Sequence, residues 1–205
     1  MKTEINRCPL HFLQAVLSAA LIMYDLTASS QINIVNNGGF EGGWNNGPVG
    51  WQWTYNVGLD EGFSSAAQGG SFAQVYGTLY QDLPTAPGHQ YHIEFAMAGN
   101  YAVPQQAELD VQWGNTTVGS VTWDPAGHNV NNLGWVWGEF DVVATTTFTW
   151  LTFSNPNVGT ENIPDLDAVS VVAVPEPSSL SLLCLGIAAI TPGLFRMRRQ
   201  SPPRA

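Results

Sequence analysis

The stretch Tyr91-His92-Ile93-Glu94-Phe95-Ala96-Met97-Ala98 decides the fold class of this chain. Its large apolar side chains recur at every second position, and polar or small side chains stand between them. Successive side chains of a strand point to opposite faces, so this period places one face in a core and the other toward solvent. The stretch therefore predicts a half-buried antiparallel β-strand.

The same alternation recurs on both sides of that stretch. It is seen in Trp51-Gln52-Trp53-Thr54-Tyr55 and over 108–113, and no part of 31–174 shows a sustained helical period. Further strands are expected at 32–35, 71–76, 78–83, 117–123, 135–143, 147–154 and 166–173. Turn signals such as Pro87-Gly88 lie between them. Many short strands at this spacing predict an all-β fold, an antiparallel β-sandwich of the jelly-roll kind.

The charge distribution is uneven, because every basic residue lies near an end of the chain. Three of the 16 acidic residues also lie outside 31–174, which leaves thirteen acids and no Lys or Arg in that stretch. A domain without cations cannot bind nucleic acid by neutralising phosphates, and it has no clamp for phosphoryl transfer. It also lacks a Lys for a Schiff base and a Cys nucleophile. A divalent cation would relieve the mutual repulsion of the acids.

Residues 1–30 have the order of a secretory signal peptide. Basic residues come first, an apolar run follows over 10–23, and small residues stand at positions 28 and 30, as cleavage before Gln31 requires. An uncleaved N-terminal anchor is the alternative. Residues 31–173 follow as the expected β-sandwich domain.

The other end of the chain has a three-part layout over 174–200, followed by a tail at 201–205. Pro175-Glu176-Pro177 precede an apolar run at 180–195, which is expected to form a transmembrane helix. The basic residues that follow at once are Arg196, Arg198 and Arg199. A helix of this length spans roughly 24 Å, and snorkelling arginines extend it toward the roughly 30 Å of a bilayer core.

This layout resembles the PEP-CTERM sorting signal of Gram-negative bacteria. The resemblance implies transient anchoring in the inner membrane through the C-terminal helix, cleavage by an exosortase, and transfer to the cell surface or extracellular matrix. A plain C-terminal membrane anchor is the alternative. Both possibilities place the middle domain outside the cytoplasm.

Residues 31–174 are similar to galactose-binding-like jelly rolls, which include carbohydrate-binding modules. The motifs that carry the similarity are Asn36-Asn37-Gly38-Gly39-Phe40-Glu41, Leu79-Tyr80-Gln81-Asp82-Leu83 and Leu166-Asp167-Ala168-Val169-Ser170-Val171. The resemblance implies a jelly roll, and it supports the fold more than the function because one fold serves many functions.

In that family a calcium ion often ties the first strand to the last. The residues that match are Glu41 and Asp167, so the resemblance implies a structural Ca2+ held by these two acids. Carboxylate oxygens are ligands that calcium prefers. The alternative is a pair of acids that cap loops through ordinary hydrogen bonds.

A sugar-binding surface requires flat aromatic rings beside polar groups, because the C–H face of a pyranose packs on an indole while its hydroxyls bind carboxylates and amides. Strand phase places Trp135 and Trp137 on one face with Glu139, and this face points outward if Phe140 points inward. Trp150 poses the same question on a later strand. We expect these three tryptophans and Glu139 to bind carbohydrate. The alternative is that the second sheet or a loop covers the rings.

Catalysis is not expected from this sequence. His89 and His92 lie three residues apart, which puts them on opposite faces of a strand, and no nucleophile elbow is present. The sequence therefore predicts an exported protein that binds extracellular polysaccharide without catalysis. The alternative is a structural surface or matrix protein that engages other proteins and has no sugar ligand.

Overall fold

Ten β-strands and no helix make up the regular secondary structure of the residues that the computed structural model describes, 31–62 and 65–175. In chain order they are β1 (Gln52–Thr54), β2 (Val57–Glu61), β3 (Ser71–Val75), β4 (Thr78–Pro84), β5 (Gln90–Gly99), β6 (Ala107–Trp113), β7 (Thr116–Trp123), β8 (Val136–Val143), β9 (Phe148–Ser154) and β10 (Pro164–Ala173).

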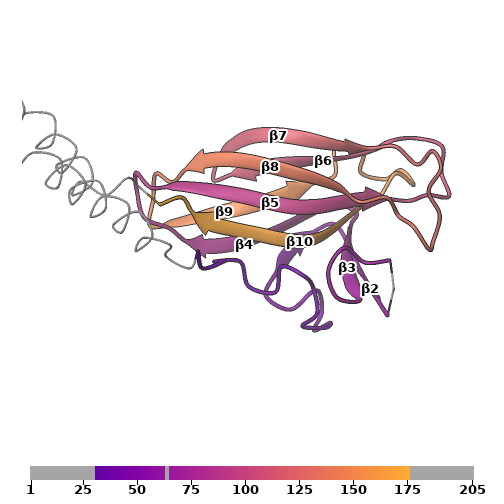
Figure 1. The fold of residues 1–205 in the computed structure, drawn as a ribbon, viewed down its shortest axis with the longest axis horizontal. Coiled ribbons are helices and arrows are strands. Elements are labelled where there is room, and N and C mark those ends of the chain that lie inside the picture. The colour runs from indigo at the N-terminus through magenta and orange to yellow at the C-terminus, as the bar shows by residue number, and fades with distance from the viewer. Residues whose placement is uncertain (1–30, 63–64, 176–205) are drawn as a thin grey trace, which may run out of the picture. The chain divides into compact units, whose positions relative to one another are not determined.

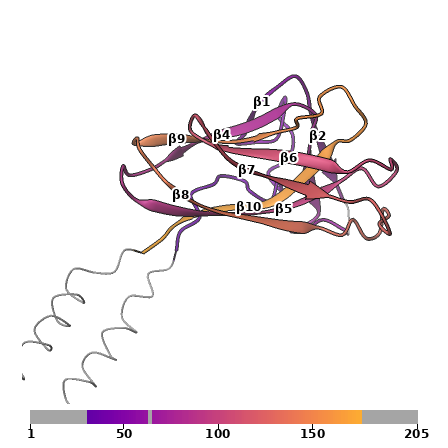
Figure 2. The same ribbon diagram turned by 90° about the horizontal axis from the view of Figure 1, so that it is seen from above.

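The strands form two five-stranded sheets that pack face to face (Figures 1 and 2). The first sheet has the order β1-β4-β9-β6-β7, and the second has the order β2-β3-β10-β5-β8. Neighbouring strands within each sheet run antiparallel. The expected all-β antiparallel sandwich is therefore confirmed.

Strand β5 contains the stretch 91–98 and shows why that pattern gives a sandwich. Ile93 and Phe95 are buried between the sheets, whereas His92 and Glu94 are partly exposed on the outer face of the second sheet. The ring of Phe95 meets that of Phe153, from the first sheet, with centroids 5.0 Å apart and planes at 70°. Burial of such apolar side chains is the main driving force for bringing the two sheets together.

The prediction of a strand at 32–35 is wrong. One isolated bridge, between Asn33 and Val172, is all that pairs this segment with β10. The side chain of Asn33 takes over part of the pairing, because its Oδ1 accepts hydrogen bonds from the N–H groups of Val35 and Val171. Short polar side chains of this kind compete with the backbone for its own hydrogen bonds.

Strand β2 was not expected from the sequence, and the alternation over 51–55 ends early. Trp51 is buried, but Tyr55 is 75% exposed and has a left-handed φ of 71°. This backbone conformation redirects the chain between β1 and β2, so the two strands join different sheets.

The predicted signal peptide, the transmembrane helix at 180–195, and Glu176, Pro177, Arg196, Arg198 and Arg199 of the sorting segment lie outside the described residues. Within 31–62 and 65–175 no helix is long and apolar enough to cross a membrane.

Candidate functional site

An exposed tryptophan stands on the outer face of the second sheet. In β8 the small or apolar Gly138 and Val142 are buried, and Trp137 and Glu139 point outward. Trp137 is 53% exposed, which leaves much of its indole open to solvent. The expected phase of this strand is confirmed for these residues. A ring this exposed lies outside the core, and its flat face is free to make contacts.

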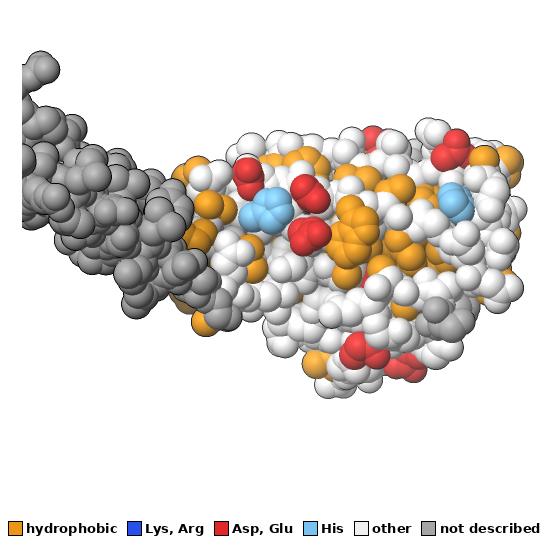
Figure 3. Space-filling view, viewed as in Figure 1, with side chains coloured by type: hydrophobic (Ala, Val, Ile, Leu, Met, Phe, Trp, Pro, Cys, Tyr) orange, Lys and Arg blue, Asp and Glu red, His pale blue; other side chains and the backbone are white. Residues whose placement is uncertain are grey.

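Acidic side chains lie near this tryptophan on its own strand and on the neighbouring strand. The strands β5 and β8 pair so that Glu94 stands directly opposite Glu139, and His92 opposite Asp141. Nδ1 of His92 lies 2.8 Å from Oδ1 of Asp141. Figure 3 shows acidic side chains between a large hydrophobic side chain and a histidine on this side of the molecule.

We call the set Trp137, Glu139, Asp141, Glu94 and His92 the Trp137 face. Like charges directly opposite each other on adjacent strands destabilise a sheet, and the Glu94–Glu139 pair is of this kind. The Trp137 face thus combines an open aromatic ring with a concentration of hydrogen-bond acceptors.

Trp135 lies beside this face but is half-buried instead of open. Its Nε1 donates a hydrogen bond of 2.6 Å to the carbonyl of Ser65, and its ring meets the edge of Phe72 with centroids 5.4 Å apart. Position 135 precedes the first residue of β8, so strand phase does not govern it. Trp135 therefore packs against the core as well as bordering the Trp137 face.

Trp150 is separated from the other predicted residues, because β9 belongs to the first sheet. Its side chain is 55% exposed on the outer face of that sheet, opposite Asp82 on β4. The centroid of the Tyr80 ring lies 6.0 Å from that of the Trp150 ring, and the two ring planes are at 49° to each other. The structure thus divides the four residues predicted to bind sugar between two sheets.

Glu41 and Asp167, the predicted calcium ligands, both bind the segment 68–71. Oε1 of Glu41 accepts hydrogen bonds of 2.8 Å from the N–H groups of Gly70 and Ser71. Oδ2 of Asp167 accepts one of 2.8 Å from the N–H of Gln68. The described residues contain no group of three or more His, Cys, Asp or Glu that could hold a metal. The two acids are therefore brought together, and calcium stays a prediction.

Burial raises the pKa of Asp167 to about 6, and the charge of Glu41 contributes in the same direction, against the lowering effect of the hydrogen bonds. Oxygen donors of this kind fit Ca2+, which takes six to eight oxygen ligands. The two side chains could supply only part of such a set, so backbone carbonyls or water would complete it.

Asp165 is a buried acid that the sequence analysis did not single out. Its Oδ1 accepts no hydrogen bond from any described residue. Burial raises its pKa well above the usual range, and the charge of Asp60 raises it further, while a hydrogen bond from Gln74 opposes this. The alternation Asp165-Leu166-Asp167 is a signal that could have placed both acids on one face of the closing strand.

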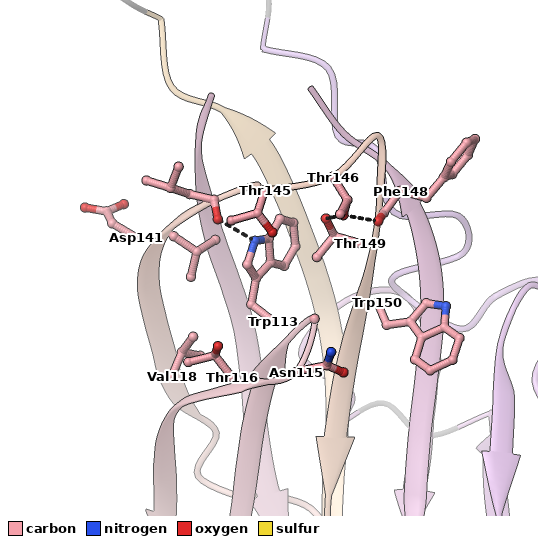
Figure 4. Close-up of a pocket in the computed structure, with 13 residues that line it drawn as sticks. Trp113, Asn115, Thr116, Val118, Asp141, Thr145, Thr146, Phe148, Thr149 and Trp150 are labelled. Atoms are coloured by element: carbon pink, nitrogen blue, oxygen red, sulfur yellow. Dashed lines mark hydrogen bonds between the residues drawn. The ribbon is translucent and has the colours of Figure 1, made fainter. Parts of the chain in front are cut away.

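A pocket of about 580 Å³ lies beyond the β6–β7 turn, and we call it the corner pocket (Figure 4). Its lining comes from the β6–β7 turn, the end of β8, the connection at 144–147 and the start of β9. The polar lining residues include Asn115, Thr116, Asp141, Thr145, Thr146 and Thr149. Trp113 lies at its centre in Figure 4, and its Nε1 donates to the carbonyl of Val143. This pocket could not be predicted from the sequence, because four separate segments build it.

Comparisons with known proteins identify the sorting signal near the end of the chain and the class of fold. Residues 173–199 match the PEP-CTERM protein-sorting motif. This motif confirms the sorting signal and marks the chain as an exported protein. No curated protein matches the sequence.

Among solved structures, the chain resembles a tandem carbohydrate-binding domain, CBM22-1-CBM22-2 of Xyn10C from Paenibacillus barcinonensis, with a TM-score of 0.52 and 16% identity over 75% of this chain and 48% of that one. It resembles the Stig cyclase FisC from Fischerella sp. TAU with a TM-score of 0.50 and 18% identity over 72% of this chain and 100% of that one. TmCBM61, solved in complex with β-1,4-galactotriose, gives a TM-score of 0.47 and 19% identity over 70% of this chain and 99% of that one. The likeness to the CBM22-1-CBM22-2 domain shows a jelly-roll fold of the kind found in carbohydrate-binding modules.

Proposed function

We propose that this exported protein binds carbohydrate without catalysis, and that the Trp137 face is the binding surface. The observation that supports this is the exposure of Trp137 on a strand whose other face is buried in the core. The C–H face of a pyranose ring can pack on the indole. Its hydroxyls can donate hydrogen bonds to the carboxylates of Glu139 and Glu94, because ionised carboxylates only accept them.

The pair Glu94 and Glu139 suits binding better than glycoside hydrolysis. A glycosidase needs one carboxylic acid whose environment raises its pKa, such as an apolar pocket. Glu139 is exposed on a sheet surface that is open to solvent. A carboxylate on such a surface can accept hydrogen bonds from the hydroxyls of a sugar, but no pocket encloses the substrate there.

The sorting motif also supports a proposal about where the protein is found. We infer that an exosortase removes the segment after Pro175-Glu176-Pro177 and that the ligand is extracellular polysaccharide at the cell surface or in the matrix. Mass spectrometry of surface material tests the processing step. Chains that begin near Gln31 and lack Arg196 to Ala205 are expected, and intact C-terminal tails in the mature fraction would contradict it.

The binding proposal is tested with the full-length chain in detergent and an array of neutral oligosaccharides and polysaccharides. Trp137→Ala should weaken binding of every retained glycan by about tenfold or more, if base–aromatic stacking of roughly 1–3 kcal/mol is a fair analogue. Tyr55→Ala is the matched control, because Tyr55 is an exposed aromatic residue away from this face. If the wild-type chain retains no glycan, the proposal of carbohydrate binding is wrong.

A further inference from the structure

We infer that the corner pocket is a terminal subsite of the Trp137 face, which holds the end or a branch of a neutral sugar chain. This inference rests on the proposed function. It assigns a second part of the site and a class of ligand, a polysaccharide recognised through its end and not only along its length.

The two surfaces are continuous along one strand. The outward-facing row of β8 runs through Trp137, Glu139, Asp141 and Val143. Asp141 and Val143 are also part of the lining of the corner pocket. Six residues of a strand cover roughly 20 Å, which is the distance from the indole to the pocket end of the row. A chain that lies on Trp137 and follows β8 therefore reaches the pocket.

The pocket is bounded by several chain segments, whereas the Trp137 face is an open sheet surface. In Figure 4 the residues of β8 and β7 stand on one side and β9 on the other, with the 144–147 connection and the β6–β7 turn closing the remaining sides. These bounding segments leave less room for an internal stretch of polymer than for the end of one. A terminal sugar or a side branch enters from the mouth and ends there.

The polar groups at the mouth are available to a ligand, and those of the wall are not. Within the described part of the chain, the side chains of Asn115, Thr116 and Thr145 make no hydrogen bond. In contrast, Oγ1 of Thr146 donates to the carbonyl of Phe148, and Oγ1 of Thr149 lies 2.9 Å from Oγ1 of Thr85. A wall fixed by its own hydrogen bonds with free hydroxyl and amide groups at the mouth is a preorganised site.

Charge decides between the possible occupants. Residues 31–174 carry thirteen acids and no Lys or Arg, and Asp141 borders the pocket, although its carboxylate points away from the other lining side chains (Figure 4). Anionic sugars and a second copy of the chain are therefore repelled. A volume of about 580 Å³ lies in the range of small-ligand pockets, and its hydroxyl, amide and indole lining matches a neutral polyhydroxylated ligand.

The test compares short oligosaccharides with intact polymer. Thr116→Trp fills the pocket from an exposed strand position, and Thr122→Trp is the matched control, because Thr122 is an exposed residue of β7 outside the pocket lining. The full-length chain is titrated with xylo-, cello- and galacto-oligosaccharides of increasing length and with the corresponding insoluble polymers. Thr116→Trp should lower the affinity for the oligosaccharides about tenfold more than that for the polymers, and Thr122→Trp should not change this ratio.

The outcomes separate the two proposals. If Trp137→Ala abolishes glycan binding while Thr116→Trp and wild type bind oligosaccharides equally, the terminal subsite is wrong and the Trp137 face stands. If the wild-type chain binds none of the probes, both are wrong. Thr145→Trp, which fills the pocket from the opposite wall, serves as the second variant if Thr116→Trp fails to fold.

Discussion

Glu41 and Asp167 come from opposite ends of the domain sequence and hold the same four residues of chain. Glu41 accepts hydrogen bonds from the N–H groups of Gly70 and Ser71, and Asp167 accepts one from the N–H of Gln68. The segment between β2 and β3 is therefore fixed by carboxylates on both sides. It borders the second sheet, so these bonds also stabilise the sheet that carries the Trp137 face.

The first prediction concerns Glu41 itself. Glu41→Ala removes the acceptor for two backbone N–H groups, one exposed and one part-buried, and a hydrogen bond of this kind contributes about 0.5–1.5 kcal/mol net. We expect urea unfolding to show a loss in that range. Gly69→Ala should act on the same contact, because Gly69 has a φ of +65° and an added Cβ would lie 2.3 Å from Oε1 of Glu41. Unchanged stability in both variants would show that this contact is unimportant.

Calcium is tested by its effect on thermal stability. A ligand that binds only the folded form stabilises it by about 2.7 kcal/mol at a concentration one hundred times its dissociation constant. Addition of Ca2+ to chelator-treated protein should therefore raise the melting temperature by several degrees. Asp167→Asn should remove this response. A wild-type melting curve that is the same with Ca2+ and with chelator would leave the two acids as loop-capping groups only.

The pH dependence of stability should reflect Asp165. Because burial raises its pKa above the unfolded value of 3.8, the folded state keeps a proton that the unfolded chain has lost. The folded state then binds more protons, so stability falls as the pH rises above 3.8. Asp167 acts in the same direction between 3.8 and about 6.

Asp165→Asn should consequently raise the melting temperature at pH 7.5 in metal-free buffer and reduce the gain in stability that wild type shows on acidification. Asp82→Asn is the matched control, because Asp82 is exposed on β4. Equal pH profiles for wild type and Asp165→Asn would contradict the assignment of this dependence to Asp165.

Truncation of Trp135 should lower the free energy of unfolding, whereas truncation of Trp137 should leave it nearly unchanged. Trp135→Ala removes a ring that contacts Phe72 and a hydrogen bond to Ser65, so we expect a loss of roughly 3 kcal/mol, the lower end for buried aromatic residues. Trp137→Ala leaves no cavity and should change unfolding by no more than about 0.5 kcal/mol. Chemical denaturation measures both. A large loss from Trp137→Ala would make that residue structural and remove the main support for the binding surface.

The local pattern of side chains was sufficient for the fold class and for the orientation of single strands. The alternation at 91–98 is a property of adjacent residues, and it holds wherever the strand pairs, so the buried Ile93 and the outward Glu94 were predictable. The same reasoning placed Trp137 and Glu139 on one face of their strand, but it made the outward direction of that face conditional on an inward Phe140. The sorting segment was also evident from the sequence, because its three parts are contiguous in the chain.

Only the tertiary structure decided which strands are neighbours. Period-two alternation does not reveal that β8 pairs with β5, and so it could not show that Glu94 faces Glu139. It could not place Trp150 in the other sheet, nor show that the backbone turns at Tyr55 between β1 and β2. The corner pocket joins four segments through long-range packing. Such contacts depend on the free energy of the whole fold and not on local preference, which is why they could not be predicted from the sequence by itself.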